Sequence, residues 1–349
     1  MKKERNLYID VLKAFSIILV VLGHCVQYGA GKEYSDYGLF FANPVFIFIY
    51  SFHMPLFMLI SGFLFAYSVK NRSWLNVLIT KGKQLLIPLA GWSVVSTLIS
   101  IIKIICGVST RKFSFIWLCQ SLYSGFWGGP WFLWAMWWGI VAVVLVRTLL
   151  RDNPFAYLLL TAATFFIPDT ICPAVYKFML PFFILAYYFN AHGISVKFKK
   201  VYMNPIFIVG CALTFTALIH LFNYDTYIYT SGFYIFAYPG NAVWQIHNNV
   251  LRFVIGLFGS ISFAYLVYAL VKILPEIINR PLAFLGRTTL GVYIISGYIF
   301  TEVLIRIPIK ELNYGYIILE TVAIMAVSVI ITLLIQKFKY ANRLLLGGR

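Results

Sequence analysis

The chain has few charged residues and very few acidic ones. Only 11% of its 349 residues are charged, compared with about 25% in an ordinary soluble domain. Just 11 residues are Asp or Glu, whereas 28 are Lys or Arg and 61% are hydrophobic. The apolar residues recur in long runs along the whole sequence, which excludes an ordinary soluble domain and indicates a polytopic membrane protein.

Cysteine is also scarce. The five cysteines are scattered, odd in number and never in CxxC spacing. This excludes a disulfide framework and a cysteine metal site as the basis of the fold, so we predict no metal and regard the cysteines as small apolar residues.

The basic residues lie mainly in short connections and tails between the apolar runs. This distribution is the positive-inside pattern, and it predicts that both termini are cytoplasmic. The net charge of +17 therefore does not indicate a nucleic-acid partner. We expect the chain to be surrounded by membrane lipids.

The apolar runs predict an all-α bundle of about ten transmembrane helices in a single domain over residues 1–349, with no appended soluble domain. The predicted spans are 7–28, 43–68, 83–106, 131–150, 155–171, 174–190, 204–222, 250–272, 284–305 and 314–337. Two connections on the outer side are long, 107–130 and 223–249. The second is rich in Tyr, Asn, Gly and Trp, which suits contact with a sugar but also an aromatic belt at the membrane surface.

Three ionisable residues interrupt the first apolar run: Asp10, Lys13 and His24. At 100° per residue, Lys13 and His24 are eleven steps apart, which is within about 20° of three full turns, so they share one helix face with Asp10. A charge at the bilayer centre costs about 2.5–3.5 kcal/mol, so such a stripe should face a wet or protein-lined interior. The alternatives are that Asp10 and Lys13 snorkel to the cytoplasmic headgroups, and that His24 is a neutral histidine bonded to a backbone carbonyl.

The second apolar run contains His53 two residues before Pro55. Proline removes a backbone donor and kinks a helix, and polar groups beside a kink can line a cavity. His53 is therefore either a kink-filling residue or a functional group. Ser61 and Gly62 follow and predict a close approach of another helix.

Four basic residues crowd the connection after the second span: Lys70, Arg72, Lys81 and Lys83. They are either ordinary topology signals or a site for phosphates on the cytoplasmic side. The fourth span opens with five aromatic residues between Trp131 and Trp138, which form either an interfacial belt or a cavity wall.

Four segments together resemble the acyltransferase-3 family of integral-membrane O-acyltransferases, and most nearly its fucose 4-O-acetylase-like branch. They are IDVLKAFSIILVVLGH, YSFHMPLFMLISGFLF, GPWFLWAMWW and LGRTTLGVYIIS. The resemblance implies an enzyme of the bacterial cytoplasmic membrane that moves an acetyl group from cytoplasmic acetyl-CoA to a hydroxyl of a cell-surface or lipid-linked glycan. Its partners are thus an acyl-CoA donor and a carbohydrate acceptor.

The resemblance also implies roles for the residues singled out above. His24 either activates the acceptor hydroxyl or carries the acyl group, His53 is a second acid–base group or orients the thioester, and Asp10 holds Lys13. Lys13 stands where many members of the family have arginine, and Ser296 stands where many have histidine.

The donor would be held by Lys13 at its pantetheine or phosphate end, and by Arg72, Lys81 and Lys83 at its phosphates. Trp131 is also predicted to contact the donor.

The competing interpretation is a transporter or flippase of a lipid-linked sugar, with the polar stripe as its path. Transporters often have two related halves, which this sequence does not display.

Overall fold

The structure is a computed structural model that describes residues 6–70, 72–228, 239–307 and 312–348. These residues form helices and connecting turns, and no β-strand occurs among them. Eight of the described helices are long and apolar enough to cross a membrane. They are α1 (Leu7–Tyr28), α3 (Pro44–Val69), α4 (Trp74–Ile105), α6 (Trp131–Leu149), α8 (Ala174–Ala191), α13 (Ala242–Ile273), α15 (Thr289–Glu302) with its extension η4 (Leu304–Arg306), and α16 (Tyr314–Lys337). The all-α polytopic membrane fold is thus confirmed.

Shorter helices connect or flank these eight. They are α2 (Gly31–Asp36), η1 (Leu39–Ala42), α5 (Phe115–Trp127), α7 (Pro154–Thr164), α9 (Ile194–Lys197), α10 (Lys199–Tyr202), α11 (Pro205–Ile219), η2 (Tyr224–Thr226), η3 (Pro239–Asn241), α14 (Glu276–Arg287) and α17 (Lys339–Leu346). The predicted spans 155–171 and 204–222 correspond to α7 and α11, which are apolar but shorter than a typical membrane span.

Several boundaries differ from the sequence-based prediction, and α13 begins at Ala242 instead of residue 250. Helix α4 begins at Trp74 instead of residue 83, because Ser73 caps it by accepting a hydrogen bond from the Asn76 backbone N–H. The predicted loop 107–130 contains α5, which is capped in the same way by Ser114. The predicted span 284–305 is divided at Thr288 between α14 and α15.

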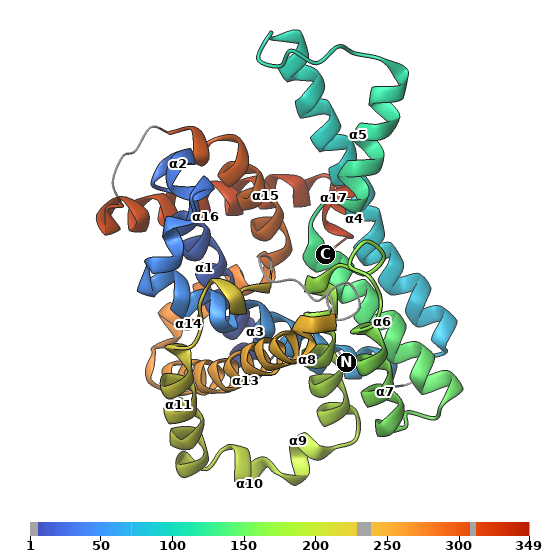
Figure 1. Cartoon of the computed structure of the whole chain (residues 1–349), viewed down its shortest axis with the longest axis vertical. Helices are drawn as coiled ribbons and strands as arrows, with labels where there is room; N and C mark the ends of the chain where they lie inside the picture. Colours follow the sequence, from blue (N-terminus) through green and yellow to red (C-terminus); the bar gives the residue numbers. More distant parts are fainter. Residues whose placement is uncertain (1–5, 71, 229–238, 308–311, 349) are drawn as a thin grey trace.

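Helix α1 lies at the centre of the bundle and contacts α3, α13, α14, α15 and α16. In Figure 1, α11 and α13 lie side by side, and α9 and α10 join α8 to α11. The hairpin of α4 and α5 protrudes at the top of Figure 1. The Lys103–Glu302 ion pair links α4 to α15.

Two glycines lie at very close contacts between helices. A Cβ atom on Gly286 would lie 1.8 Å from the carbonyl oxygen of Asp10, so α14 packs directly on the backbone of α1. A Cβ atom on Gly62 would lie 2.1 Å from the carbonyl oxygen of Phe183, where α3 packs on α8. The close approach predicted at Ser61 and Gly62 is therefore confirmed.

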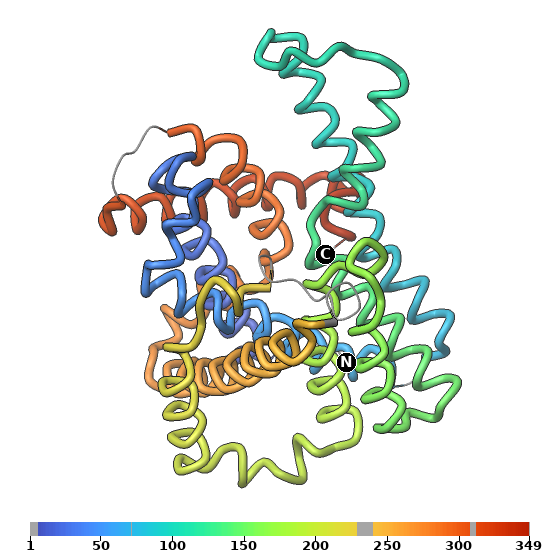
Figure 2. The backbone as a smooth tube through the Cα atoms, in the orientation of Figure 1, coloured from blue at the N-terminus to red at the C-terminus, as the bar shows by residue number. Residues whose placement is uncertain are grey.

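The C-terminal helix α17 folds back against α4, as the red end of the tube in Figure 2 shows. The Trp92 indole N–H donates to the carbonyl oxygen of Leu345 at 2.8 Å, and the Leu346 side chain is buried. This docking brings the last helix into the wall of an internal cavity.

Candidate active site

The helices around α1 enclose two adjoining cavities. We call the first the histidine cavity; it has a volume of about 760 Å³ and contains His24 and His53 in its wall. We call the second the lysine cavity; it has a volume of about 910 Å³ and contains Lys13 and Lys81 in its wall. The two cavities share three lining residues: Val20 of α1, Met54 of α3 and Tyr293 of α15.

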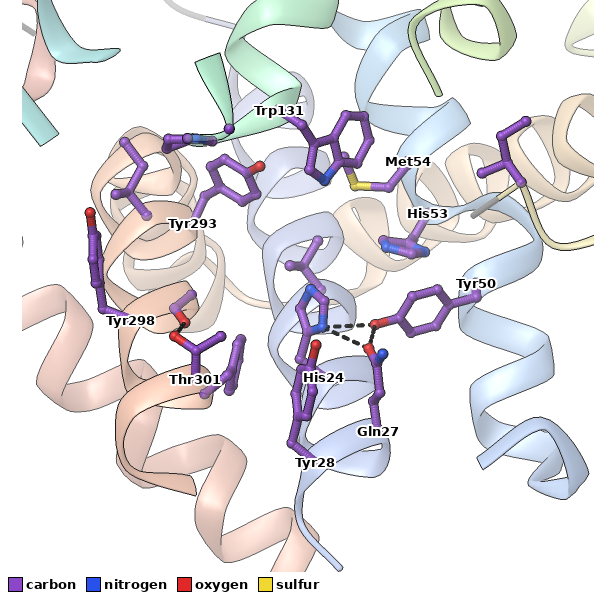
Figure 3. Close-up of a pocket in the computed structure, with 18 of the residues that line it drawn as sticks. His24, Gln27, Tyr28, Tyr50, His53, Met54, Trp131, Tyr293, Tyr298 and Thr301 are labelled. Carbon is purple, nitrogen blue, oxygen red and sulfur yellow. Dashed lines mark hydrogen bonds between the residues drawn. The ribbon is translucent and has the colours of Figure 1, made fainter. Parts of the chain in front are cut away.

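The His24 imidazole belongs to a three-residue hydrogen-bond network at the histidine cavity (Figure 3). Its Nδ1 atom lies 2.8 Å from the Tyr50 hydroxyl oxygen and 3.2 Å from Gln27 Oε1. The Tyr50 hydroxyl donates to the same Gln27 Oε1 at 2.8 Å. Gln27 Oε1 only accepts hydrogen bonds, so its contact with Nδ1 of His24 requires the tautomer that carries the proton on Nδ1, and Nε2 then keeps its lone pair.

Aromatic rings fix the plane of the His24 ring. The ring centroids of Tyr28, Tyr50 and Phe300 lie 5.9, 5.8 and 4.9 Å from that of His24. Figure 3 shows the unbonded edge of the imidazole pointing toward the space between Trp131 and Tyr293. His24 is thus held at a set orientation by side chains, and the alternative of a histidine bonded to a backbone carbonyl does not describe it.

His53 is held differently. Its side chain is buried, and its Nδ1 atom lies 2.8 Å from the carbonyl oxygen of Ile49, one turn earlier in α3. A carbonyl only accepts, so Nδ1 is protonated and Nε2 again keeps a lone pair. The Tyr50 ring packs edge-on against both histidines, with its centroid 4.8 Å from that of His53. Helix α3 continues through Pro55, which also lines the histidine cavity.

The aromatic segment at the start of α6 serves both cavities. Trp131 lines the histidine cavity, whereas its neighbour Phe132 lines the lysine cavity. The Phe132 backbone N–H donates to the Tyr293 hydroxyl oxygen at 3.4 Å, which ties the shared wall to α6. Trp134 instead stacks on Trp127, with ring centroids 4.6 Å apart. The predicted cavity wall and ordinary aromatic packing thus both occur within this one segment.

In the lysine cavity, Lys13 is paired with Asp10 at 3.1 Å across one helical turn. Asp10 lines neither cavity, and its carboxylate instead forms an ion pair with Lys13. Lys81 and Arg287 add two further cations to the lining, and the described lining residues include no Asp or Glu. Asn342 and Leu346 of the C-terminal helix α17 also line this cavity.

The other predicted donor-binding residues lie elsewhere. Arg72 and Lys83 are exposed, and neither is among the described residues that line the two cavities. Trp131 lies in the histidine cavity instead of beside Lys13. Part of the outer connection 223–249, namely 229–238, lies outside the described residues; Thr226, just before that gap, lines the histidine cavity.

Several site residues were not singled out in the sequence. Gln27 and Tyr50 bond to His24, Arg287 joins the lysine cavity, and Arg252 lines the histidine cavity although its side chain is only 2% exposed. The signal for Gln27 was present, since it lies three residues after His24 on the same helix face. An arginine inside an apolar span was the available signal for Arg252.

These features define a polytopic membrane protein with two adjoining internal cavities, one bearing histidines and the other bearing cations. The chain belongs to the acyltransferase-3 family, since the family described as "Acyltransferase domain" matches residues 6–337. It is therefore a membrane acyltransferase by family.

Two proteins named "Nodulation protein NolL" are similar to this chain. The one from Mesorhizobium japonicum is 29% identical over 211 residues, which cover 57% of this chain and 53% of the relative. The one from Sinorhizobium fredii is 26% identical over 316 residues, which cover 85% of this chain and 78% of the relative. The chain thus aligns with about half of the length of the first relative and most of the second. No solved structure shows significant similarity to it.

Proposed function

We propose that the protein is an O-acetyltransferase that takes an acetyl group from acetyl-CoA in the lysine cavity and transfers it to a glycan hydroxyl in the histidine cavity. The observation that carries this proposal is the shared wall of Val20, Met54 and Tyr293 between the two cavities. Lys13 and His24 stand on one helix about 16 Å apart along its axis. A donor and an acceptor can therefore meet at the shared wall from opposite sides.

The lysine cavity suits the donor because CoA carries phosphates. Lys13, Lys81 and Arg287 line it, and ammonium and guanidinium groups form strong charge-assisted hydrogen bonds to phosphate oxygens. Arg72 and Lys83 lie on the same connection and helix as Lys81, and in this proposal they attract CoA to the cavity mouth. Asp10 orients Lys13 through their ion pair.

The histidine cavity suits the chemistry of the acceptor. His24 Nε2 takes the proton of a sugar hydroxyl while the hydroxyl oxygen bonds to the thioester carbonyl carbon. The tetrahedral intermediate then breaks its carbon–sulfur bond, and the CoA thiolate leaves with the proton from the His24 imidazolium. Tyr50 and Gln27 hold the ring during both proton transfers, and His53 Nε2 accepts a hydrogen bond from a neighbouring sugar hydroxyl.

The same proposal sets the orientation. The positive-inside distribution supports cytoplasmic termini, which puts the Lys13 end of α1 on the cytoplasmic side, where acetyl-CoA is made. His24 then faces the outer side, where glycans of the cell envelope are built, and the membrane is the bacterial cytoplasmic membrane.

Radiolabelled acetyl-CoA and purified protein in detergent test the proposal. Wild-type protein should transfer label to an oligosaccharide acceptor, His24→Ala should lose transfer while still binding CoA, and His220→Ala, at an exposed histidine after α11, should behave like wild type. If acetyl-CoA neither binds nor turns over, while a lipid-linked sugar crosses proteoliposome membranes, the protein is a transporter instead.

A further inference from the structure

The wall of the histidine cavity carries two arginines and no acid among its described residues. Arg252 of α13 and Arg111, in the connection between α4 and α5, both line it beside His24 and His53. A neutral sugar needs hydrogen bonds and aromatic faces, which this cavity already supplies through Gln27 and Trp131. Two guanidinium groups exceed that need.

Arg252 is built into the wall. Its side chain is only 2% exposed, and its Nε donates to Asn249 Oδ1 at 2.8 Å, with a second contact from the guanidinium to the same oxygen. The guanidinium carbon lies 5.4 Å from the centroid of the Phe178 ring, which also lines the cavity. Placing an ionisable side chain within a membrane span is costly, and such residues commonly serve function.

The acid whose charge acts on Arg252 is Asp169, and this carboxylate is also paired with a lysine. Asp169, in the connection before α8, accepts a hydrogen bond from Lys177 Nζ at 2.5 Å, and the Lys177 side chain is wholly buried. The carboxylate of Asp169 is not among the described lining residues of the cavity. Among the described residues, the lining of the cavity therefore carries two guanidinium groups and no carboxylate.

Arg111 has a complementary position. It is exposed and lies in the hairpin that protrudes in Figure 1, on the predicted outer side, where the positive-inside rule disfavours a basic residue. Its place in the lining of the histidine cavity gives this exception a reason. An exposed cation leading to a buried one creates a positive potential along the cavity, which attracts anions toward the interior.

We infer that the acceptor carries an oxyanion, a phosphate or a carboxylate, that binds to Arg252 after attraction by Arg111. The inference rests on the proposed function and narrows its acceptor class to anionic glycans. The guanidinium forms a planar fork of donors that matches two oxygens of either group, and it does so best when water is excluded. The oxyanion is supplied either by the phosphate that joins a glycan to its lipid or by an acidic sugar.

Three acceptors with one oligosaccharide core separate these sources: the neutral core, the core ending in a uronic acid, and the core joined to a short polyprenyl phosphate. For wild-type protein, at least one anionic acceptor should have a KM about tenfold below that of the neutral core. Arg252→Gln should bring the ratio of these KM values close to one, and Arg252→Lys should restore it only in part.

Arg111→Gln should raise the KM of the anionic acceptor about threefold and weaken its dependence on salt. Lys112→Gln is the matched control, because Lys112 is an exposed neighbour outside the cavity lining. Because Arg111 is exposed, its substitution should not prevent folding. The Arg111→Gln variant therefore tests anion binding even if Arg252→Gln does not fold.

Calorimetric binding of the three acceptors separates this inference from the proposed function. Arginine-dependent binding of an anionic acceptor without acetyl transfer would support the inference and contradict the proposed function. Equal binding and equal KM values for neutral and anionic acceptors, or a preference that survives in both arginine variants, would overturn the inference and leave acetyl transfer standing. The anionic acceptor that is preferred identifies the source of the oxyanion.

Discussion

The Nδ1 atom of His24 lies 2.8 Å from the hydroxyl oxygen of Tyr50, which in turn donates to Gln27. These two aromatic residues come from different helices, α1 and α3, so the contact joins the two segments that carry the histidines. It also leaves Nε2 of His24 as the basic atom on the cavity side. A base that is held in one tautomer and one orientation needs less reorganisation before it can accept a proton.

We predict that Tyr50→Phe lowers kcat because the hydroxyl that orients His24 is lost. The expected loss is about 10- to 100-fold, within the range of a positioned acid–base group, with a small change in the KM for acetyl-CoA. Tyr37→Phe, at an exposed tyrosine after α2, is the control. Wild-type kcat in Tyr50→Phe would mean that this hydrogen bond does not orient the base.

Lys13→Ala should weaken the binding of CoA about tenfold, since a charge-assisted contact is lost. Asp10→Asn should weaken it less, because Lys13 keeps its charge and loses only its partner at 3.1 Å. Calorimetry with CoA measures both changes, and Lys32→Ala, at an exposed lysine on α2, is the comparison. Equal CoA affinity in wild type and Lys13→Ala would remove Lys13 from the donor site.

Gly286→Ala should destabilise the protein by about 1–3 kcal/mol, the usual cost of overpacking. The added methyl would lie 1.8 Å from the Asp10 carbonyl oxygen, so α14 would have to move away from α1. Gly210→Ala is the matched control on α11, because nothing lies within 4 Å of its added Cβ atom. Thermal unfolding in detergent compares the two, and equal stability would argue against this helix contact.

Val20→Phe should separate donor binding from transfer. Val20 is 2% exposed and lines both cavities, so a larger side chain fills the shared wall and leaves Lys13 and His24 unchanged. We expect near-normal CoA affinity and a kcat reduced at least about tenfold, because misplaced reacting groups lose that much. Loss of CoA binding with a normal kcat at saturating CoA would contradict the assignment of Val20 to the wall where donor and acceptor meet.

Local sequence patterns were enough to predict the membrane helices and the polar face of α1. Spanning helices must satisfy their own backbone groups in lipid and are long and apolar, so hydropathy finds them. The single-helix register of Asp10, Lys13 and His24 follows from helix geometry alone. Helix α5 was missed because its mixture of Ser, Gln, Gly and aromatics reads as an outer connection.

The rest of the site depends on tertiary packing. Tyr50 reaches His24 only because α3 packs on α1, and Arg252 joins them from a helix more than 200 residues further along the chain. Nothing in the sequence around Tyr50 or Arg252 shows that these two residues meet His24 at one cavity. Glycine contacts such as that of Gly286 with Asp10 decide the convergence, and they involve partners far apart in the sequence.

The passage of an acyl group between the two cavities is tested most directly in sealed inside-out vesicles that hold the glycan acceptor in the lumen. Radiolabelled acetyl-CoA, which does not cross the membrane, is added outside, and label on the luminal glycan is measured for wild type and Val20→Phe. We predict labelled luminal glycan with wild-type protein and little with the Val20→Phe variant. Label appearing only on glycan added outside, on the same side as the donor, would contradict this prediction.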